Sequence, residues 1–253
     1  MHRTPVRAAL AAALLLPLVA ACGGGDKNDA KSSTTLTVLT AASLTDVFKQ
    51  AGTAYEKDHP GTKVNFSFAG SQELASQVRQ GVPADALVTA DTTTMDGLKS
   101  DTDKPVVIAK NRLTIVTAQG DPKGVKGLAD LSRSDLKVVL AAPQVPVGRY
   151  SQKVLDQQHV KVRPVSQEAN VRAVLSKVSL GEADAGIVYL TDAAAAKGKV
   201  STVTVPDAQN AVASYPAAAL KGSKHPEEAA DFVKWLGSGE AQKLLRAAGF
   251  QQP

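Results

Sequence analysis

Two serines follow short apolar runs and stand where helices are expected to begin. Ser43 lies in LTAASLTDVF after the run at 36–39, and Ser71 lies in FAGSQELASQV after the run at 64–68. A helix start leaves backbone N–H groups without intrahelical partners, and the helix dipole adds about half a positive charge there. With a hydroxyl donor and small neighbours, such an end can bind an anion without lysine or arginine. N-capping is the simpler alternative for each serine, because serine is a preferred N-cap residue.

Residues suited to catalysis or metal binding do not form recognisable patterns. The four histidines are scattered, and both His59 and His225 precede a proline, which is typical of a turn. The chain contains no G-x-S-x-G nucleophile elbow and no Walker phosphate loop, so we expect neither enzymatic activity nor a cofactor. Asp85 and Asp91 are interpreted as turn or cap groups, because a carboxylate would repel a bound dianion.

The elements that must position these donors alternate along the chain. Short runs rich in Val, Ile, Leu and Thr predict strands at 36–39, 64–68, 86–90, 113–118, 136–141, 185–190, 200–205 and 215–220. Amphipathic segments predict helices at 43–58, 71–80, 147–157 and 170–180, and two more within 226–248. This alternation predicts an α/β fold with largely parallel sheets covered on both faces. In such folds, ligands bind beyond the carboxyl ends of the strands, where the following helices start.

The N-terminal segment is typical of a bacterial lipoprotein signal. Arg3 and Arg7 precede an apolar run at 8–20, and the small residues of LVAAC lead to Cys22, the one cysteine of the chain. We therefore predict a signal peptide at 1–21 and a lipid-anchored flexible tether at 22–35; an ordinary secretory signal is the alternative. Cleavage would leave 253 − 21 = 232 residues with a net charge of 5 − 2 = +3. This mild charge, without a dense basic run, gives no support for nucleic-acid binding.

Four segments resemble, in order, the molybdate-binding proteins of ABC importers: LTVLTAASLTDVF, VNFSFAGSQELASQVRQGVPADALVTAD, VPVGRYSQKVL and GEADAGIVYLTDA. The resemblance extends from about Leu36 to Phe250. It implies the two-lobed type II periplasmic binding-protein fold, with the ligand in the cleft between the lobes. On this basis we place lobe 1 at 36–112 plus 216–253 and lobe 2 at 113–215. Asn111 and the Tyr215-Pro216 pair are the candidate hinge positions.

The resemblance also implies the ligand and the residues that bind it. Molybdate or tungstate would be held by uncharged donors. These are the hydroxyls and amides of Ser43 and Ser71, the backbone amides of Val147 and Val171, and the phenolic hydroxyl of Tyr189. Val147 stands where the family often has alanine, a difference of little weight if only the amide is used. Arg149 and Arg172 are expected to raise the local positive potential without touching the anion.

The resemblance implies delivery of the anion to an ABC importer permease, and we expect a monomer. The lipid on Cys22, predicted from the signal segment, would hold it on the extracytoplasmic face of the cell membrane. A protein binding another tetrahedral oxyanion, such as sulfate, is the main alternative. A metal-binding protein of the same architecture is less favoured, because the four tyrosines include no adjacent pair. A secreted enzyme would need a histidine or carboxylate within hydrogen-bond reach of Ser43 or Ser71.

Overall fold

The computed structural model describes residues 33–253; the predicted signal peptide, Cys22 and most of the predicted tether lie outside the described residues. The strands are β1 (Thr34–Ala41), β2 (Thr62–Ala69), β3 (Ala86–Val88), β4 (Val106–Ala118), β5 (Val138–Ala141), β6 (Ser166–Glu168), β7 (Ala185–Tyr189), β8 (Val200–Thr204) and β9 (Val212–Ala219). The helices are α1 (Thr45–Asp58), α2 (Ser71–Arg79), α3 (Thr92–Asp96), α4 (Pro146–Gln157), α5 (Val171–Ser179), α6 (Leu190–Ala195), α7 (Pro226–Trp235) and α8 (Gly239–Ala247). Three short 3₁₀ segments are η1 (Ala42–Leu44), η2 (Leu128–Ser132) and η3 (Asp207–Gln209). Across this part of the chain, every helix is too short or too polar to span a bilayer.

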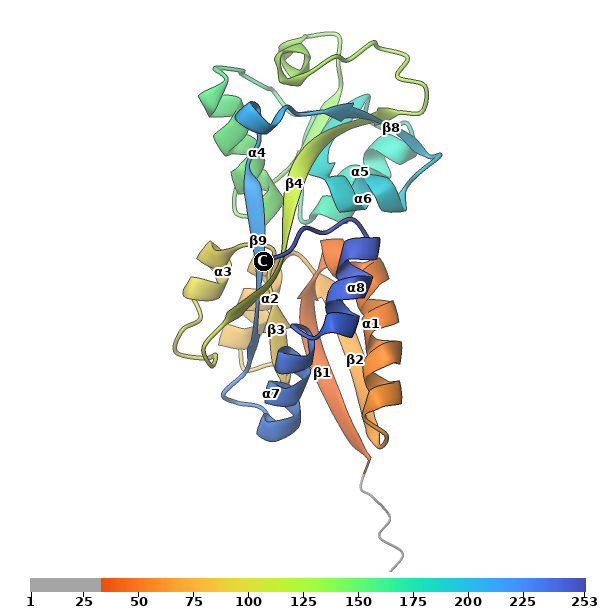
Figure 1. Cartoon of the computed structure of the whole chain (residues 1–253). Helices are drawn as coiled ribbons and strands as arrows, with labels where there is room; N and C mark the ends of the chain where they lie inside the picture. The colour runs from red at the N-terminus through yellow and green to blue at the C-terminus, as the bar shows by residue number, and fades with distance from the viewer. Residues whose placement is uncertain (1–32) are drawn as a thin grey trace, which may run out of the picture. The chain divides into compact units, whose positions relative to one another are not determined.

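The nine strands form one sheet. Eight of them follow the order β2-β1-β3-β9-β4-β7-β5-β6, and β8 pairs with β4. Figure 1 shows β4 and β9 running side by side between a group of elements around β1–β3 and a group around α4–α6. The first half of β4, up to Arg112, pairs with β9, whereas its second half, from Leu113, pairs with β7 and β8. The change of partner at 112/113 divides the sheet into two halves that share these two strands.

Successive residues of the strands place apolar side chains on both faces of the first half of the sheet. In β3, Ala86 and Val88 belong to one buried cluster and Leu87 to another. Phe48 of α1 and Phe232 of α7 join the first cluster. The second cluster includes the buried residues Leu74 of α2 and Met95 of α3. Because successive strand residues point to opposite faces, helices cover this half on both sides, as the sequence predicts.

The predicted strands and helices are confirmed with small changes at their ends, but the prediction of largely parallel sheets is only partly right. The pairs β1–β2, β1–β3, β5–β6 and β5–β7 are parallel. The pairs β3–β9, β4–β7, β4–β8 and β4–β9 are antiparallel. The antiparallel pairs all involve β4 or β9, the two long connections that run in opposite directions between the halves. Strand β6, helices α3 and α6, and the first half of β4 were not predicted.

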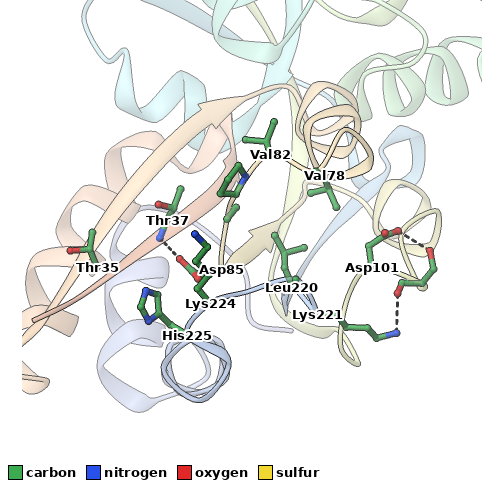
Figure 2. A pocket seen from close by; sticks show the side chains of 15 residues that line it. Thr35, Thr37, Val78, Val82, Asp85, Asp101, Leu220, Lys221, Lys224 and His225 are labelled. Carbon is green, nitrogen blue, oxygen red and sulfur yellow. Dashed lines mark hydrogen bonds between the residues drawn. The ribbon is translucent and has the colours of Figure 1, made fainter. Parts of the chain in front are cut away.

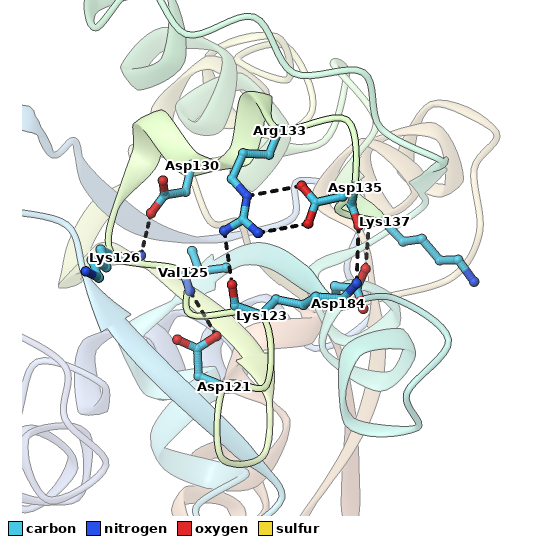
Figure 3. A network of polar contacts seen from close by, with 9 residues as sticks. All are labelled: Asp121, Lys123, Val125, Lys126, Asp130, Arg133, Asp135, Lys137 and Asp184. Atoms are coloured by element: carbon cyan, nitrogen blue, oxygen red, sulfur yellow. Dashed lines mark hydrogen bonds and ion pairs between the residues drawn. The ribbon is translucent and has the colours of Figure 1, made fainter.

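Local polar contacts on either side of η2 hold the segment between β4 and β5 (Figure 3). Arg133 makes two hydrogen bonds to Asp135, of 3.1 and 2.8 Å, and one of 3.0 Å to the carbonyl of Lys123. Asp184 accepts a 2.8 Å hydrogen bond from the backbone N–H of Lys137, which ties this segment to the residue before β7. These contacts hold the loop in place but contribute nothing to the cavity described next.

Candidate functional site

All five predicted ligand-binding residues line one small cavity. Ser43 follows β1 in η1, Ser71 is the first residue of α2, Val147 is the second of α4, Val171 is the first of α5, and Tyr189 is the last of β7. The cavity measures about 20 Å³, which suits a small ion rather than an organic metabolite. Its other lining residues are Ala41, Ala42, Ala69, Gly70, Ala90, Val145, Pro146 and Asn170. The structure therefore brings the predicted residues together; their binding of an anion stays a prediction.

The cavity wall is uncharged and built mainly from small residues. No Lys, Arg, Asp or Glu is among the residues that line it. A side chain on Gly70 would place a Cβ 2.4 Å from the carbonyl oxygen of Ala169, and one on Gly148 would place it 2.1 Å from that of Ala142. Only glycine lets these backbone segments approach so closely, and the helix starts are thereby held against the cavity. A wall of this type offers amides and hydroxyls but no counter-charge.

The two serines do not cap their helices, so the simpler alternative from the sequence is wrong. Gly70 is the N-cap residue of α2, and no side chain caps either α1 or α2. The Ser71 hydroxyl oxygen instead accepts a 3.0 Å hydrogen bond from the backbone N–H of Ala90. The Ser43 hydroxyl lies 3.0 Å from the phenolic oxygen of Tyr215. Both serines are buried, so their hydroxyls belong to the cavity and not to solvent.

The phenolic oxygen of Tyr189 is buried and has no hydrogen-bond partner within the described part of the protein. Buried hydroxyls without a partner cost about 1–3 kcal/mol, so proteins rarely retain them without a role. Burial raises the pKa of Tyr189 well above its ordinary value, and the neighbouring Tyr215, Tyr150, Asp91 and Asp192 raise it further. The phenol therefore keeps its proton and can donate it to a ligand in the cavity that offers an acceptor.

Backbone amides at helix starts are the remaining candidate donors. Val147 is the second residue of α4 and Val171 is the first residue of α5, and N–H groups at these positions have no partner inside the helix. Asn170 caps α5 by accepting a 3.0 Å hydrogen bond from the N–H of Ala173, which leaves the Val171 amide unused by the cap. Ser71, Val147 and Val171 thus bring the N-terminal ends of α2, α4 and α5 to the same cavity, and each helix dipole favours negative charge there.

Two arginines lie beside the cavity but do not line it. Arg149 of α4 donates a 2.9 Å hydrogen bond from Nε to Asp91, and its guanidinium also contacts Thr94 at 2.8 Å. Arg172 of α5 lies 2.8 Å from Asp46 of α1 and 2.7 Å from the buried carboxylate of Asp192. Because each guanidinium faces at least one carboxylate, the positive potential expected from these arginines is largely offset.

Asp85 and Asp91, the two carboxylates named from the sequence, and the buried Asp192 are engaged away from the cavity. Asp91 caps α3 by accepting a 3.0 Å hydrogen bond from the N–H of Thr94, as predicted. Asp85 accepts hydrogen bonds from the N–H of Thr37 at 2.7 Å and the hydroxyl of Ser223 at 2.6 Å. Asp192 is fully buried, and burial raises its pKa to about 6 despite the opposing effect of Arg172. None of the three lines the cavity.

The predicted hinge residues Asn111 and Tyr215 also belong to the surroundings of the site. The Asn111 side-chain nitrogen donates a 2.8 Å hydrogen bond to the hydroxyl of Thr191 and a 3.5 Å one to the Tyr215 hydroxyl. Both residues are buried, and Tyr215 contacts Ser43 directly. The sequence did not identify them as parts of the site, because their contacts join residues 80 to 172 positions apart.

A larger hollow of about 700 Å³ lies at the opposite ends of the strands (Figure 2). It is lined near the start of β1 by Thr35 and Thr37, and near the start of β3 by Asp85. Lys224 and His225 are among its other lining residues. Ligands of open α/β sheets bind at the carboxyl ends of strands, where Ser43 and Ser71 lie, so the smaller cavity is the better candidate.

The alternatives based on catalysis or on metal ligands find no support at the cavity. The partners of the Ser43 and Ser71 hydroxyls are a phenol and a backbone amide, with neither histidine nor carboxylate among them. Among residues 33–253, no group of three or more His, Cys, Asp or Glu side chains could hold a metal ion. The site is therefore a set of hydrogen-bond donors around a space sized for a small ion.

Comparisons with known proteins agree with this description. Residues 36–251 match the family model described as bacterial extracellular solute-binding protein. The chain is 37% identical to the molybdate-binding protein ModA of Mycobacterium tuberculosis, over 96% of this chain and 97% of the relative. It is 33% identical to the putative ABC transporter substrate-binding lipoprotein YvgL of Bacillus subtilis, over 95% and 96% respectively.

A solved structure shows the same fold. The periplasmic molybdate-binding protein of Azotobacter vinelandii superposes with a TM-score of 0.71 at 22% identity, covering 86% of this chain and 99% of the other. The predicted two-lobed type II fold and the resemblance noted in the sequence are confirmed. So is the prediction of a solute-binding protein rather than an enzyme. The chain belongs to the family of bacterial extracellular solute-binding proteins.

Proposed function

We propose that this protein captures molybdate, or tungstate, outside the cytoplasm for an ABC importer. One observation supports this most: hydroxyls and helix-start amides from five strand-to-helix junctions surround a single uncharged cavity. The buried Tyr189 hydroxyl, which has no partner in the described protein, needs an acceptor there. A fully deprotonated oxyanion offers only acceptors, so it fits a site that offers donors. The similarity to proteins named molybdate-binding supports the same choice of ligand.

Size is the proposed basis of selectivity. Molybdate and tungstate have longer metal–oxygen bonds than the sulfur–oxygen bonds of sulfate, so a rigid set of donors fitted to them leaves sulfate short of some contacts. Each buried donor left unpaired costs about 1–3 kcal/mol, so two such misfits reduce sulfate affinity on the order of 10²- to 10³-fold. We attribute the rigidity to the close backbone packing at Gly70, which lines the cavity, and at Gly148 in the first turn of α4.

Capture is proposed to occur by closure of two lobes, 36–112 plus 216–253 and 113–215. The change of partner along β4 at 112/113 supports the first boundary. Gln72 of α2 donates a 2.8 Å hydrogen bond to the carbonyl of Ala169, across the proposed cleft. The ion pairs of Arg149 with Asp91 and of Arg172 with Asp46 also cross it. Contacts of this kind would hold the closed form around the anion.

The remaining parts of the proposal concern the membrane and the oligomeric state. Cys22 would bear the lipid, and the tether at 22–35 would give the monomeric binding protein reach to the permease. The similarity to a relative named as a lipoprotein supports the anchor. Mass spectrometry of the membrane fraction should detect a peptide that begins with acylated Cys22. In Cys22→Ser, this peptide should be absent and the protein should no longer be attached to the membrane.

Calorimetric titrations and thermal melts test which anion the protein binds. The purified protein, in buffer free of sulfate and phosphate, is titrated with molybdate, tungstate and sulfate, and its melting temperature is measured with each. A ligand that binds only the folded state raises the melting temperature. We expect tight binding of molybdate and tungstate, and sulfate weaker by about two orders of magnitude or more. Sulfate binding as tightly as molybdate would contradict the selectivity, and no response to any of the three would contradict the proposal itself.

A further inference from the structure

We infer that Tyr215 is a positioning residue for the anion site: it donates its proton to the Ser43 hydroxyl oxygen and leaves the Ser43 proton free for the ligand. Tyr215 does not line the cavity, but its hydroxyl oxygen lies 3.0 Å from that of Ser43, which does. The inference rests on the proposed function, since it concerns how that site presents its donors.

The orientation of the Asn111 amide decides the direction of these hydrogen bonds. The Asn111 Oδ1 atom accepts a 2.9 Å hydrogen bond from the backbone N–H of Arg112. The Nδ2 atom must therefore face the other way, toward Thr191 Oγ1 at 2.8 Å and Tyr215 Oη at 3.5 Å. An amide nitrogen only donates, so Asn111 can offer Tyr215 a proton but cannot receive one.

Tyr215 is then left with one acceptor. Its hydroxyl oxygen has two hydrogen-bond partners among the described residues, Asn111 Nδ2 and Ser43 Oγ. Because the nitrogen cannot accept, the single phenolic proton can only go to Ser43 Oγ. Burial raises the pKa of Tyr215 above its ordinary value, and the contacts with Ser43 and Asn111 only partly oppose this, so the proton remains available. Ser43 receives a proton from Tyr215 and keeps its own for the cavity.

Ser71 shows the same arrangement with a different donor. Its hydroxyl oxygen accepts from the backbone N–H of Ala90, a group that can only donate. Both serine hydroxyl oxygens thus accept one hydrogen bond from the protein, and both keep their own proton for the ligand. For an oxyanion without protons, this prearranged direction removes the need to reorient the hydroxyls on binding. Hydrogen bonds in such chains also strengthen one another.

A double-mutant cycle tests whether Tyr215 acts through Ser43. Molybdate affinity is measured by calorimetry for the wild type, Tyr215→Phe, Ser43→Ala and the double variant. We expect Tyr215→Phe alone to weaken binding roughly 5- to 15-fold, the weight of one hydrogen bond. In the Ser43→Ala background, the same change should have almost no effect. Equal losses in the two backgrounds, or wild-type affinity in Tyr215→Phe, would overturn the inference.

A second variant reverses the direction of the hydrogen bonds between Asn111, Tyr215 and Ser43. It keeps the test valid if Tyr215→Phe folds poorly. In Asn111→Asp, a carboxylate of the same shape replaces the amide, and its free oxygen accepts the Tyr215 proton. Ser43 must then donate to Tyr215 and withdraw its own proton from the cavity. We expect a loss larger than that of Tyr215→Phe, and a smaller one when Ser43 is already alanine. A loss of unchanged size in the Ser43→Ala background would reflect charge alone and would count against the inference.

A matched control separates this effect from the general removal of a buried phenol. Tyr55 is buried in the core between α1 and α7, away from the cavity, and packs edge-to-face on Phe232 and Trp235. Tyr55→Phe should leave molybdate affinity unchanged; a loss equal to that of Tyr215→Phe would overturn the assignment. Failure of the wild type to bind molybdate or tungstate would remove the proposed function and the inference together. Binding by the wild type with an additive cycle would remove the inference alone.

Discussion

The hydroxyl oxygen of Ser71 accepts a 3.0 Å hydrogen bond from the backbone N–H of Ala90, so a helix-start serine serves the next strand-to-helix junction instead of its own helix. Ala90 follows β3 and lines the same cavity as Ser71. The contact joins two neighbouring junctions of the sheet and fixes the distance between their donors. It also gives Ser71 two roles, one in stability and one in binding, which unfolding and binding measurements report separately.

Ser71→Ala should therefore reduce both stability and affinity. The Ala90 N–H would remain buried without its acceptor, which costs about 1–3 kcal/mol of unfolding free energy, and the anion would lose one donor. Urea unfolding and calorimetry measure the two effects. Ser76→Ala on the same helix, whose hydroxyl serves the exposed side chain of Gln80, is the control and should change neither by much. Unchanged stability in Ser71→Ala would contradict the role of the Ala90 contact.

Tyr189→Phe should have the opposite effect on the ligand-free protein. The wild-type phenol buries a hydroxyl without a partner, so its removal should leave the ligand-free protein as stable as before, or up to about 1–3 kcal/mol more stable. Molybdate affinity should fall about tenfold or more, because a donor to a charged acceptor contributes roughly 1.5–3 kcal/mol. Thermal melts without ligand and calorimetric titrations check both halves. An affinity equal to that of the wild type would show that the phenol does not reach the anion.

Arg149→Gln should shorten the lifetime of the bound state. The guanidinium bonds to the buried Asp91 and to Thr94, and these contacts join the two proposed lobes. Their loss should weaken the closed form by about 1.5–3 kcal/mol, which raises the rate of molybdate dissociation roughly 10- to 100-fold. Stopped-flow displacement with tungstate measures this rate. Arg133→Gln, which removes the ion pair with Asp135 shown in Figure 3, should leave the dissociation rate unchanged. An equal effect of both variants would contradict the proposal that the Arg149 contacts hold the closed form together.

Asp192→Asn should change how stability depends on pH. Burial raises the pKa of Asp192 from 3.8 to about 6, so the folded protein holds this proton more tightly than the unfolded chain does. The stabilising contribution of Asp192 is thus fully present below about pH 4 and is lost as the pH rises through about 6. The stability of the wild type relative to Asp192→Asn should fall across this window in urea unfolding of the ligand-free protein.

Asp135→Asn provides a control of opposite sign for the same experiment. The hydrogen bond from Arg133 lowers the pKa of Asp135, so its contribution is lost as the pH falls. The wild type should therefore lose stability relative to Asp135→Asn toward low pH, and not toward high pH. A pH-independent difference between the wild type and Asp192→Asn would contradict the assignment of a raised pKa to Asp192.

Much of the fold and of the site could be predicted from local sequence. The period-two and helical patterns located most strands and helices, because burial of one face imposes these periods on any sheet covered by helices. The switch from strand to helix at Ser43 and Ser71 marked the junctions where donors gather. Short or polar elements such as β6, with the sequence SQE, have no apolar pattern and were missed. The antiparallel pairing of β4 and β9 was missed as well, because the sequence of one strand does not determine which distant strand it pairs with or in which direction.

The sequence by itself thus determined the types of donor and the elements that present them: uncharged hydroxyls and amides at the starts of helices in an α/β fold. Only the tertiary structure decided that five such groups share one cavity, that neither serine caps its helix, and that Tyr215 contacts Ser43. The physical reason is distance along the chain. Capping and helix formation are contacts between near neighbours, whereas the Ser43–Tyr215 contact joins residues 172 positions apart and exists only once the sheet has assembled.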